Sequence, residues 1–175
     1  IEKRKAFNYI PKNGAAFVPA EDSFASFCLS GVKGKKVLFG KSISESESGV
    51  KFISDNGLKG ISFSVDGLTV NLPLSGEHNF TNALGVIALA KECGIEKEFI
   101  KNGLESMPVL SGRMEIQDAK LKNGVKVTLV KDCYNANPDS MTKVIEFVSS
   151  VKAEGKKYFV LADMKELGES SEEAH

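Results

Sequence analysis

Residues 61–94 are ISFSVDGLTVNLPLSGEHNFTNALGVIALAKECG, and the period of the hydrophobic residues changes within this stretch. Apolar and polar residues alternate on both sides of Asp66 and Gly67, a pair that supplies the positive φ angles of a tight primed turn. From Asn79 onward the apolar residues recur at helical spacing, at Ala83, Val86, Ile87 and Ala90. The stretch therefore predicts a β-hairpin followed by an α-helix that ends near Gly94.

The segment before the hairpin has the order strand, helix, strand. Ala15–Pro19, AAFVP, is a short apolar run between polar turns, and a helix is expected from Phe24 to Leu29. Lys36–Phe39, KVLF, predicts the next strand, and this order is typical of a parallel sheet with crossover helices. Residues 41–56 are rich in serine and glutamate and lack a helical stripe, so we expect loop or edge structure there.

The chain changes character after a second predicted helix, over Glu96–Ser106. Pro, Ser and Gly interrupt the periodic pattern between Pro108 and Gly112, which indicates a domain boundary. Beyond it we expect a second hairpin, an amphipathic helix and a further buried strand, over residues 115–119 with 125–130, 139–151 and 157–161. We therefore expect an α/β chain with two domains, residues 1–109 and 110–175.

The composition excludes several functional classes. Lysine plus arginine and aspartate plus glutamate both total 23, so net charge gives no reason to expect capture of nucleic acid or of an anionic membrane. No apolar run approaches the roughly 18 residues that a membrane span needs. The three cysteines are far apart, which favours reduced thiols in a cytosolic protein, and the two histidines lack the spacing of a metal site.

Polar residues gather at the start of the long predicted helix, in GEHNFTN. Asn79 and Asn82 are three positions apart, so both carboxamides can project from one face of the first turn. A carboxamide offers a donor and an acceptor together, the pattern that matches the edge of an adenine ring. The alternative is that either asparagine only caps the helix.

Two further clusters lie at and beyond the predicted boundary. Arg113 in SGRME has a guanidinium suited to a phosphate or a carboxylate, although a solvated surface arginine is the simpler interpretation. In KDCYNANPDSM, Asn137 and Pro138 are explained as the cap and first position of a helix. Asp132, Tyr134 and Asn135 have no such explanation and are candidates for ligand contacts. Cys133 has no nearby residue to activate it, so we expect a buried thiol.

A fourth cluster lies in LADMKELGESSEEAH. Asp163 and Glu166 follow the last predicted strand, where paired acids can bind Mg²⁺ or position an amine. The alternative is that they are solvated loop charges ahead of a helix capped by Ser170 or Ser171. Neither GxxxxGK[ST] nor GxGxxG occurs in the sequence, so the usual phosphate-binding loops are absent from it.

Taken together, GEHNFTNALGVIALAKECGI, LSGRME, KDCYNANPDSM and VLADMKELGESSEEAH resemble the ATP-dependent Mur ligases of peptidoglycan synthesis in order and spacing. YNANPDSM and DMKELGESSEEAH most resemble the branch that uses UDP-N-acetylmuramoyl-tripeptide and D-alanyl-D-alanine. Residues 1–75 resemble the family more loosely. The resemblance implies that residues 1–109 are the C-terminal half of a P-loop-type, mixed-sheet ATPase domain. It implies that residues 110–175 begin a Rossmann-like C-terminal domain.

The resemblance also implies a reaction and its residues. ATP would phosphorylate the tripeptide carboxylate, the dipeptide amine would attack the acyl phosphate, and Mg²⁺ would be needed, in a monomeric cytoplasmic enzyme. Six residues are implied to bind the nucleotide: His78, Asn79, Asn82, Arg113, Asp132 and Tyr134. Arg113 and Asp132 are also implied to be catalytic. Four residues are implied to contact substrate or support its loop: Asn135, Asn137, Asp163 and Glu166.

Several features depart from the family pattern. PAED stands where the family often has Asn and paired Asp, which leaves the role of Glu21 and Asp22 open, and Ala162 replaces a common Gly. The sequence starts IEKRKAF and ends GESSEEAH, so we expect a piece of a longer protein, inactive alone, whose phosphate loop, Mg²⁺ ligands and carbamylated lysine lie upstream. The alternatives are a related ligase, either tripeptide-forming or folylpolyglutamate synthetase-like, and a non-catalytic nucleotide-binding module. The third residue of the tripeptide is not given by the sequence.

Overall fold

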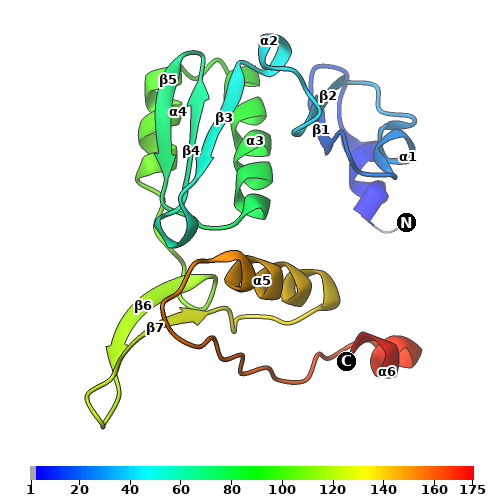
Figure 1. The fold of residues 1–175 in the computed structure, drawn as a ribbon. Helices are drawn as coiled ribbons and strands as arrows, with labels where there is room; N and C mark the ends of the chain where they lie inside the picture. The colour runs from blue at the N-terminus through cyan, green and yellow to red at the C-terminus, as the bar shows by residue number, and fades with distance from the viewer. Residues whose placement is uncertain (1–2) are drawn as a thin grey trace.

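The computed structural model describes residues 3–175, which form a mixed α/β structure (Figure 1). After a 3₁₀ helix η1 (Lys3–Tyr9), strand β1 (Ala15–Pro19) pairs in parallel with β2 (Lys35–Phe39). Helix α1 (Ala25–Leu29) connects these two strands. The predicted order of strand, helix and strand is therefore confirmed.

A three-stranded antiparallel sheet follows. Its order is β3 (Val50–Asp55), β4 (Ile61–Val65) and β5 (Leu68–Leu72). The β4–β5 turn has positive φ at Asp66 (46°) and Gly67 (82°), as the Asp-Gly pair predicted. The stretch expected to be loop or edge structure contains the edge strand β3, preceded by a short helix α2 (Glu45–Ser48) that the sequence did not indicate. A 3₁₀ turn, η2 (Gly57–Lys59), joins β3 to β4.

The main core lies between this sheet and two helices, α3 (Glu77–Glu92) and α4 (Lys97–Glu105) (Figure 1). Alternation along the hairpin directs one face of the sheet inward, and the helical period of α3 directs its own apolar face to meet it. The largest fully buried side chains are Phe63, Ile61, Leu72, Ile87, Val65 and Val70. Burial of each stabilises the fold by roughly 1.5–3 kcal/mol.

Helix α3 also joins the three-stranded sheet to the parallel pair. On its other side α3 contacts β1 and β2. Gly85 leaves room for the Phe39 ring, because a Cβ atom built at residue 85 would lie 3.0 Å from two ring atoms. Both sheets are therefore positioned by the same helix.

The C-terminal part contains an antiparallel hairpin, β6 (Glu115–Lys120) with β7 (Lys126–Lys131), followed by α5 (Pro138–Ser150). This hairpin and this helix were both predicted. Figure 1 shows α5 below the three-stranded sheet, beside the β6–β7 hairpin. The chain ends in a 3₁₀ turn η3 (Gly168–Ser170) and a short helix α6 (Ser171–Ala174), with no side-chain cap from Ser170.

The strand predicted over 157–161 was wrong. These residues are in no helix or strand, and Val160 is 97% exposed. A strand requires a neighbour that accepts and donates its backbone hydrogen bonds. Within residues 3–175, β6 and β7 pair with each other alone, so nothing pairs with this apolar segment. Within residues 3–175, no helix combines the length and the apolar character needed to cross a membrane.

Candidate functional site at the start of α3 and the Arg113 turn

Arg113 lies in a tight turn that its neighbours hold in place. Gly112 (φ 70°) and Met114 (φ 48°), on either side of it, both have left-handed backbone conformations. The Glu115 carboxylate closes the turn by accepting hydrogen bonds from the Gly112 N–H at 3.0 Å and the Ser111 hydroxyl at 3.1 Å. These two hydrogen bonds are the main reason that the pKa of Glu115 is lowered, because they stabilise its charged form.

The Arg113 turn is joined directly to the segment that follows β7. Asp132 Oδ1 accepts a hydrogen bond from the Met114 N–H at 3.1 Å, and the Gly112 carbonyl accepts from the N–H groups of Cys133 and Tyr134. The guanidinium carbon of Arg113 lies 4.0 Å from the centroid of the Tyr134 ring, a cation–π contact. The structure thus brings Arg113, Asp132 and Tyr134 together.

The two asparagines of α3 contact each other at the start of that helix. Asn79 Nδ2 donates to the Ser75 carbonyl at 2.7 Å, and Asn82 Nδ2 donates to Asn79 Oδ1 at 3.4 Å. The N-cap position is Gly76, and the helix has no side-chain cap bond. The capping interpretation of Asn79 and Asn82 was therefore wrong, and the prediction that they share one face is confirmed.

His78 connects these two groups through electrostatics. Burial lowers the pKa of the His78 imidazole, the Lys143 ammonium on α5 lowers it further, and the Asp132 carboxylate acts in the opposite direction. Figure 1 shows the N-terminal end of α3 directed toward α5. The first turn of α3 therefore faces the segment after β7 and the helix α5.

The four residues expected on the substrate side are not part of this hydrogen-bonded group. Asn137 caps α5: its Oδ1 accepts from the Ser140 N–H at 2.9 Å, and the Ser140 hydroxyl accepts from the Asn137 N–H. Asn135, Asp163 and Glu166 are exposed, and the structure gives their side chains no hydrogen bond or ion pair within residues 3–175. Glu166 also has a positive φ of 62°. No group of three potential metal ligands gathers among the described residues.

Three residues differ from expectation or were missed. Cys133 is exposed, not buried, because its segment crosses the surface of the Arg113 turn, where Gly112 leaves room for its sulfur. Glu115, which closes that turn, was named only as the start of a strand. Its spacing of four from Ser111 is a detectable signal of a local side-chain hydrogen bond. Lys143 carried no signal, because its proximity to His78 depends on how α5 packs.

Comparisons with known proteins give a consistent result. The family model of the Mur ligase middle domain matches residues 2–90, and that of the Mur ligase glutamate ligase domain matches residues 112–175. The chain is 35% identical over 177 residues to the UDP-N-acetylmuramoyl-tripeptide–D-alanyl-D-alanine ligase of Treponema pallidum, covering 99% of this chain and 36% of that protein. It is 30% identical to the Escherichia coli enzyme of the same name, covering 99% and 38%.

A solved structure agrees with these similarities. A crystal structure of MurF from Acinetobacter baumannii superposes with a TM-score of 0.76 at 26% identity, covering 98% of this chain and 37% of that one. The chain therefore spans a little over a third of the length of the curated relatives it matches.

Proposed function

The chain belongs to the Mur ligase family, and from this we propose that it is part of an ATP-dependent ligase that joins D-alanyl-D-alanine to UDP-N-acetylmuramoyl-tripeptide. The observation that carries the proposal is the group formed by Arg113, Asp132 and Tyr134, which faces His78 at the start of α3. A cation, a carboxylate and a carboxamide pair are the groups that a nucleoside triphosphate requires for its phosphates, ribose and base.

In the proposed reaction the terminal carboxylate of the tripeptide attacks the γ-phosphorus of ATP and releases ADP. The amine of the dipeptide then attacks the acyl phosphate, loses a proton and displaces inorganic phosphate, which leaves a new amide bond. Both steps develop charge on phosphoryl and carbonyl oxygens, so positioning and electrostatic stabilisation provide the catalysis.

The residues divide between the base, the ribose and the phosphates. Asn79 and Asn82 contact the adenine, with His78 beside them. Asp132 accepts hydrogen bonds from the ribose hydroxyls through the oxygen that Met114 does not use. Arg113 leaves the face of Tyr134 to contact the phosphates, an exchange of a cation–π contact for a charge-assisted hydrogen bond.

Substrate contacts and the wider organisation are also part of the proposal. On the substrate side we place Asn135, Asn137, Asp163 and Glu166. We divide the chain into a P-loop-type ATPase portion, residues 1–109, and a Rossmann-like portion, residues 110–175, of a monomeric cytoplasmic enzyme. Mg²⁺ is expected with ATP, and residues 3–175 form no set of ligands that fits it.

The direct test uses the full-length protein. With ATP, Mg²⁺, UDP-N-acetylmuramoyl-tripeptide and D-alanyl-D-alanine, we expect ADP and the amide product in equal amounts. ADP formation only with the UDP-linked dipeptide and a single amino acid, or with a folate and glutamate, would instead support a related ligase. Nucleotide binding without any turnover would support a non-catalytic module. The 175 residues alone are expected to release no phosphate.

A variant of Asp132 tests the nucleotide role within that enzyme. Asp132→Asn keeps an oxygen for the Met114 N–H and loses the charged acceptor for the ribose. We expect the KM for ATP to rise about tenfold, as for loss of one charged hydrogen bond, with a smaller change for the dipeptide. Asp118→Asn, an exposed acid on β6 that bonds Thr128, is the control and should change neither value.

A further inference from the structure

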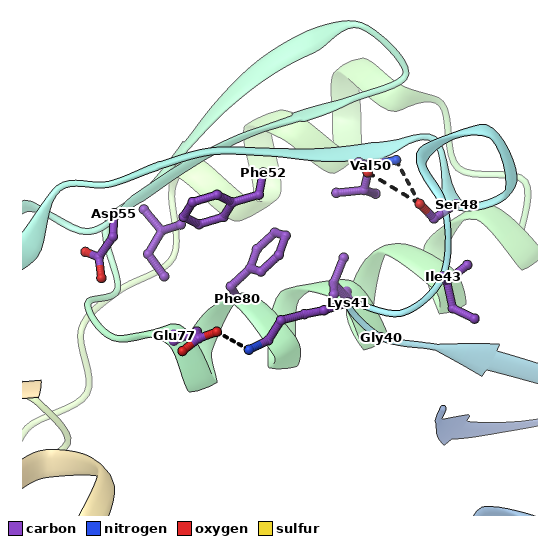
Figure 2. A pocket seen from close by; sticks show the side chains of 11 residues that line it. Gly40, Lys41, Ile43, Ser48, Val50, Phe52, Asp55, Glu77 and Phe80 are labelled. Carbon is purple, nitrogen blue, oxygen red and sulfur yellow. Dashed lines mark hydrogen bonds and ion pairs between the residues drawn. The ribbon is translucent and has the colours of Figure 1, made fainter. Parts of the chain in front are cut away.

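A pocket of about 430 Å³ lies on a different side of α3 from the nucleotide group. Its lining comes from the loop after β2, from β3 and from α3, and its apolar side chains are Ile43, Val50, Phe52, Ile61, Phe80 and Leu84. Figure 2 shows the rings of Phe52 and Phe80 facing the same space, with the Lys41 side chain reaching Glu77. Pockets of this size with apolar walls and few polar groups are typical of small-molecule sites.

The pocket is separate from the nucleotide group because of the helical period. Glu77, Phe80 and Leu84 follow one another at spacings of three and four along α3, so they share one face. His78 and Asn82 are four apart and share another face of the same helix. A ligand in the pocket would therefore not compete for the nucleotide contacts.

The pocket walls are fixed before any ligand arrives. At one end Glu21 accepts a hydrogen bond from the Ser42 N–H at 2.6 Å, and its carboxylate occupies the space beside Gly40 where a side chain would otherwise lie. On the same side of the pocket Lys91 donates to the Ser48 carbonyl and to Asp66, both at 2.7 Å, whereas Asp55 lies at the opposite end (Figure 2). Walls held by such bonds lose less conformational entropy on binding.

The aromatic surface of the pocket is partly open. Phe52 and Phe80 meet edge to face, with ring centroids 5.3 Å apart. Phe80 is buried, whereas Phe52 remains 47% exposed on the edge strand β3. The pairing of β3 with β4 shifts register between Phe52 and Ser54, and such bulges redirect side chains next to binding sites. Phe52 thus presents aromatic surface to a ligand.

The charged side chains that line the pocket leave an excess of one negative charge. Lys41 and Glu77 form an ion pair at the rim. Asp55 also lines the pocket, and its carboxylate accepts a hydrogen bond from the Gly57 N–H at 2.8 Å. No ion pair found within residues 3–175 involves Asp55. The lining therefore carries one carboxylate without a cationic partner, next to exposed aromatic surface.

We propose that this pocket binds a small organic cation, an ammonium group on an apolar or aromatic body. The ammonium pairs with Asp55 and contacts the π surface of Phe52, while the body fills the space beside Phe80 and Leu84. The face of an aromatic ring and a carboxylate both attract a cation and repel an anion. Because the pocket and the nucleotide group lie on different faces of α3, cation binding in the pocket does not depend on the ligase activity.

The test compares three probes that share a phenylethyl body and carry a cationic, neutral or anionic group at one end: 2-phenylethylamine, 2-phenylethanol and 3-phenylpropionate. Each is titrated at pH 7 into the ¹⁵N-labelled chain, and binding is followed through backbone amide shifts. We expect saturable binding of the amine, with shifts at Phe52, Asp55 and Phe80. The amine should bind about fivefold more tightly than the alcohol, as for one partly exposed ion pair, and the carboxylate more weakly than both.

Variants separate charge from shape. Asp55→Asn retains an acceptor for the Gly57 N–H and should remove most of the preference for the amine over the alcohol. Phe52→Leu removes the ring face that contacts the ammonium and should weaken the amine more than the alcohol. The matched controls are Asp118→Asn on β6 and Phe99→Leu, an exposed ring on α4, and both should bind as the unaltered chain does. Equal affinities for the three probes, shifts away from the pocket, or a loss with Asp118→Asn would each overturn the proposal.

Discussion

At the scale of single residues, Ser75 has an unusual environment. Its side chain is only 2% exposed, directly before α3, and its hydroxyl has no hydrogen-bond partner within the described chain. A buried hydroxyl without a partner loses its hydration and gains nothing in exchange. The backbone carbonyl of the same residue is occupied by Asn79, and that bond does not depend on the side chain.

Ser75→Ala should therefore stabilise the protein. We expect the free energy of unfolding, measured by urea denaturation, to rise by about 1 kcal/mol. Ser62→Ala is the matched control, because the buried hydroxyl of Ser62 accepts from Asn56 and donates to Asn71, at 2.8 and 2.7 Å. That control should lose stability, and a loss for both variants would contradict the interpretation of Ser75.

His78 predicts a pH dependence of stability. Its pKa in the folded protein is lowered from the ordinary 6.5, mainly by burial, so the unfolded chain takes up a proton more readily than the folded one. The contribution of His78 is therefore complete above pH 6.5 and is lost as the pH falls below that value. We expect the free energy of unfolding to fall less between pH 7.5 and 5.5 in His78→Gln than in the unaltered chain. His175→Gln controls for removing a histidine elsewhere, and an unchanged slope in His78→Gln would refute the prediction.

The sequence predicts residue environments well where they depend on neighbours along the chain. The Asp66 and Gly67 turn and the Asn137 cap are such cases, and both are confirmed. Cys133 and Lys143 are not, because exposure and proximity to His78 depend on packing between segments far apart in the sequence. Within the candidate site, the face shared by Asn79 and Asn82 follows from spacing, whereas the contact of Arg113 with Tyr134 requires the fold.

At the scale of elements, the start of α5 is fixed by reciprocal hydrogen bonds between Asn137 and Ser140. Both bonds satisfy N–H groups that have no partner inside the helix, and Pro138 occupies the position where the missing N–H costs nothing. This local arrangement begins the helix whose Phe147 is buried in the C-terminal part.

Asn137→Ala should lower the stability of the C-terminal part by about 1 kcal/mol. Hydrogen exchange of the α5 amides gives the measurement, because it reports this element separately from the three-stranded sheet. Asn137→Ser replaces one good capping residue with another and should retain most of the protection. If Ala and Ser behave alike, the cap does not stabilise α5.

Predictions of elements succeeded where both partners lie close in sequence. The β4–β5 and β6–β7 hairpins each combine alternation with a turn signal, so pattern and partner are adjacent. Residues 157–161 show the opposite case. The apolar pattern is that of a buried strand, but burial requires a neighbouring strand that pattern alone cannot supply.

At the scale of the whole molecule, residues 157–161 form an exposed segment that favours aggregation. Tyr158, Val160 and Leu161 are exposed in an unpaired apolar segment with high strand propensity and no proline. Such segments add strands between copies of a chain and lead to aggregation. We therefore expect this exposed segment to promote association between copies of the 175-residue chain at high concentration.

Val160→Lys should reduce that self-association. A lysine in the centre of the segment places a charge where strands from two chains would pair. Light scattering over a concentration series should show a lower apparent mass for the variant. Leu121→Lys, which replaces another exposed apolar residue in the β6–β7 turn, should not have this effect. Equal scattering by Val160→Lys and the unaltered chain would exclude the segment as the cause.

The close approach of the Phe39 ring to Gly85 limits which side chains positions 39 and 85 can carry. Alanine is normally preferred over glycine inside a helix by about 1 kcal/mol, but here its methyl group would meet the Phe39 ring. We therefore expect positions 39 and 85, on separate elements, to change together: a methyl group at 85 requires the Phe39 ring to shift by a few tenths of an ångström or to be replaced by a smaller side chain. Such paired replacement would show that the contact between residues 39 and 85 determines how closely β2 packs against α3.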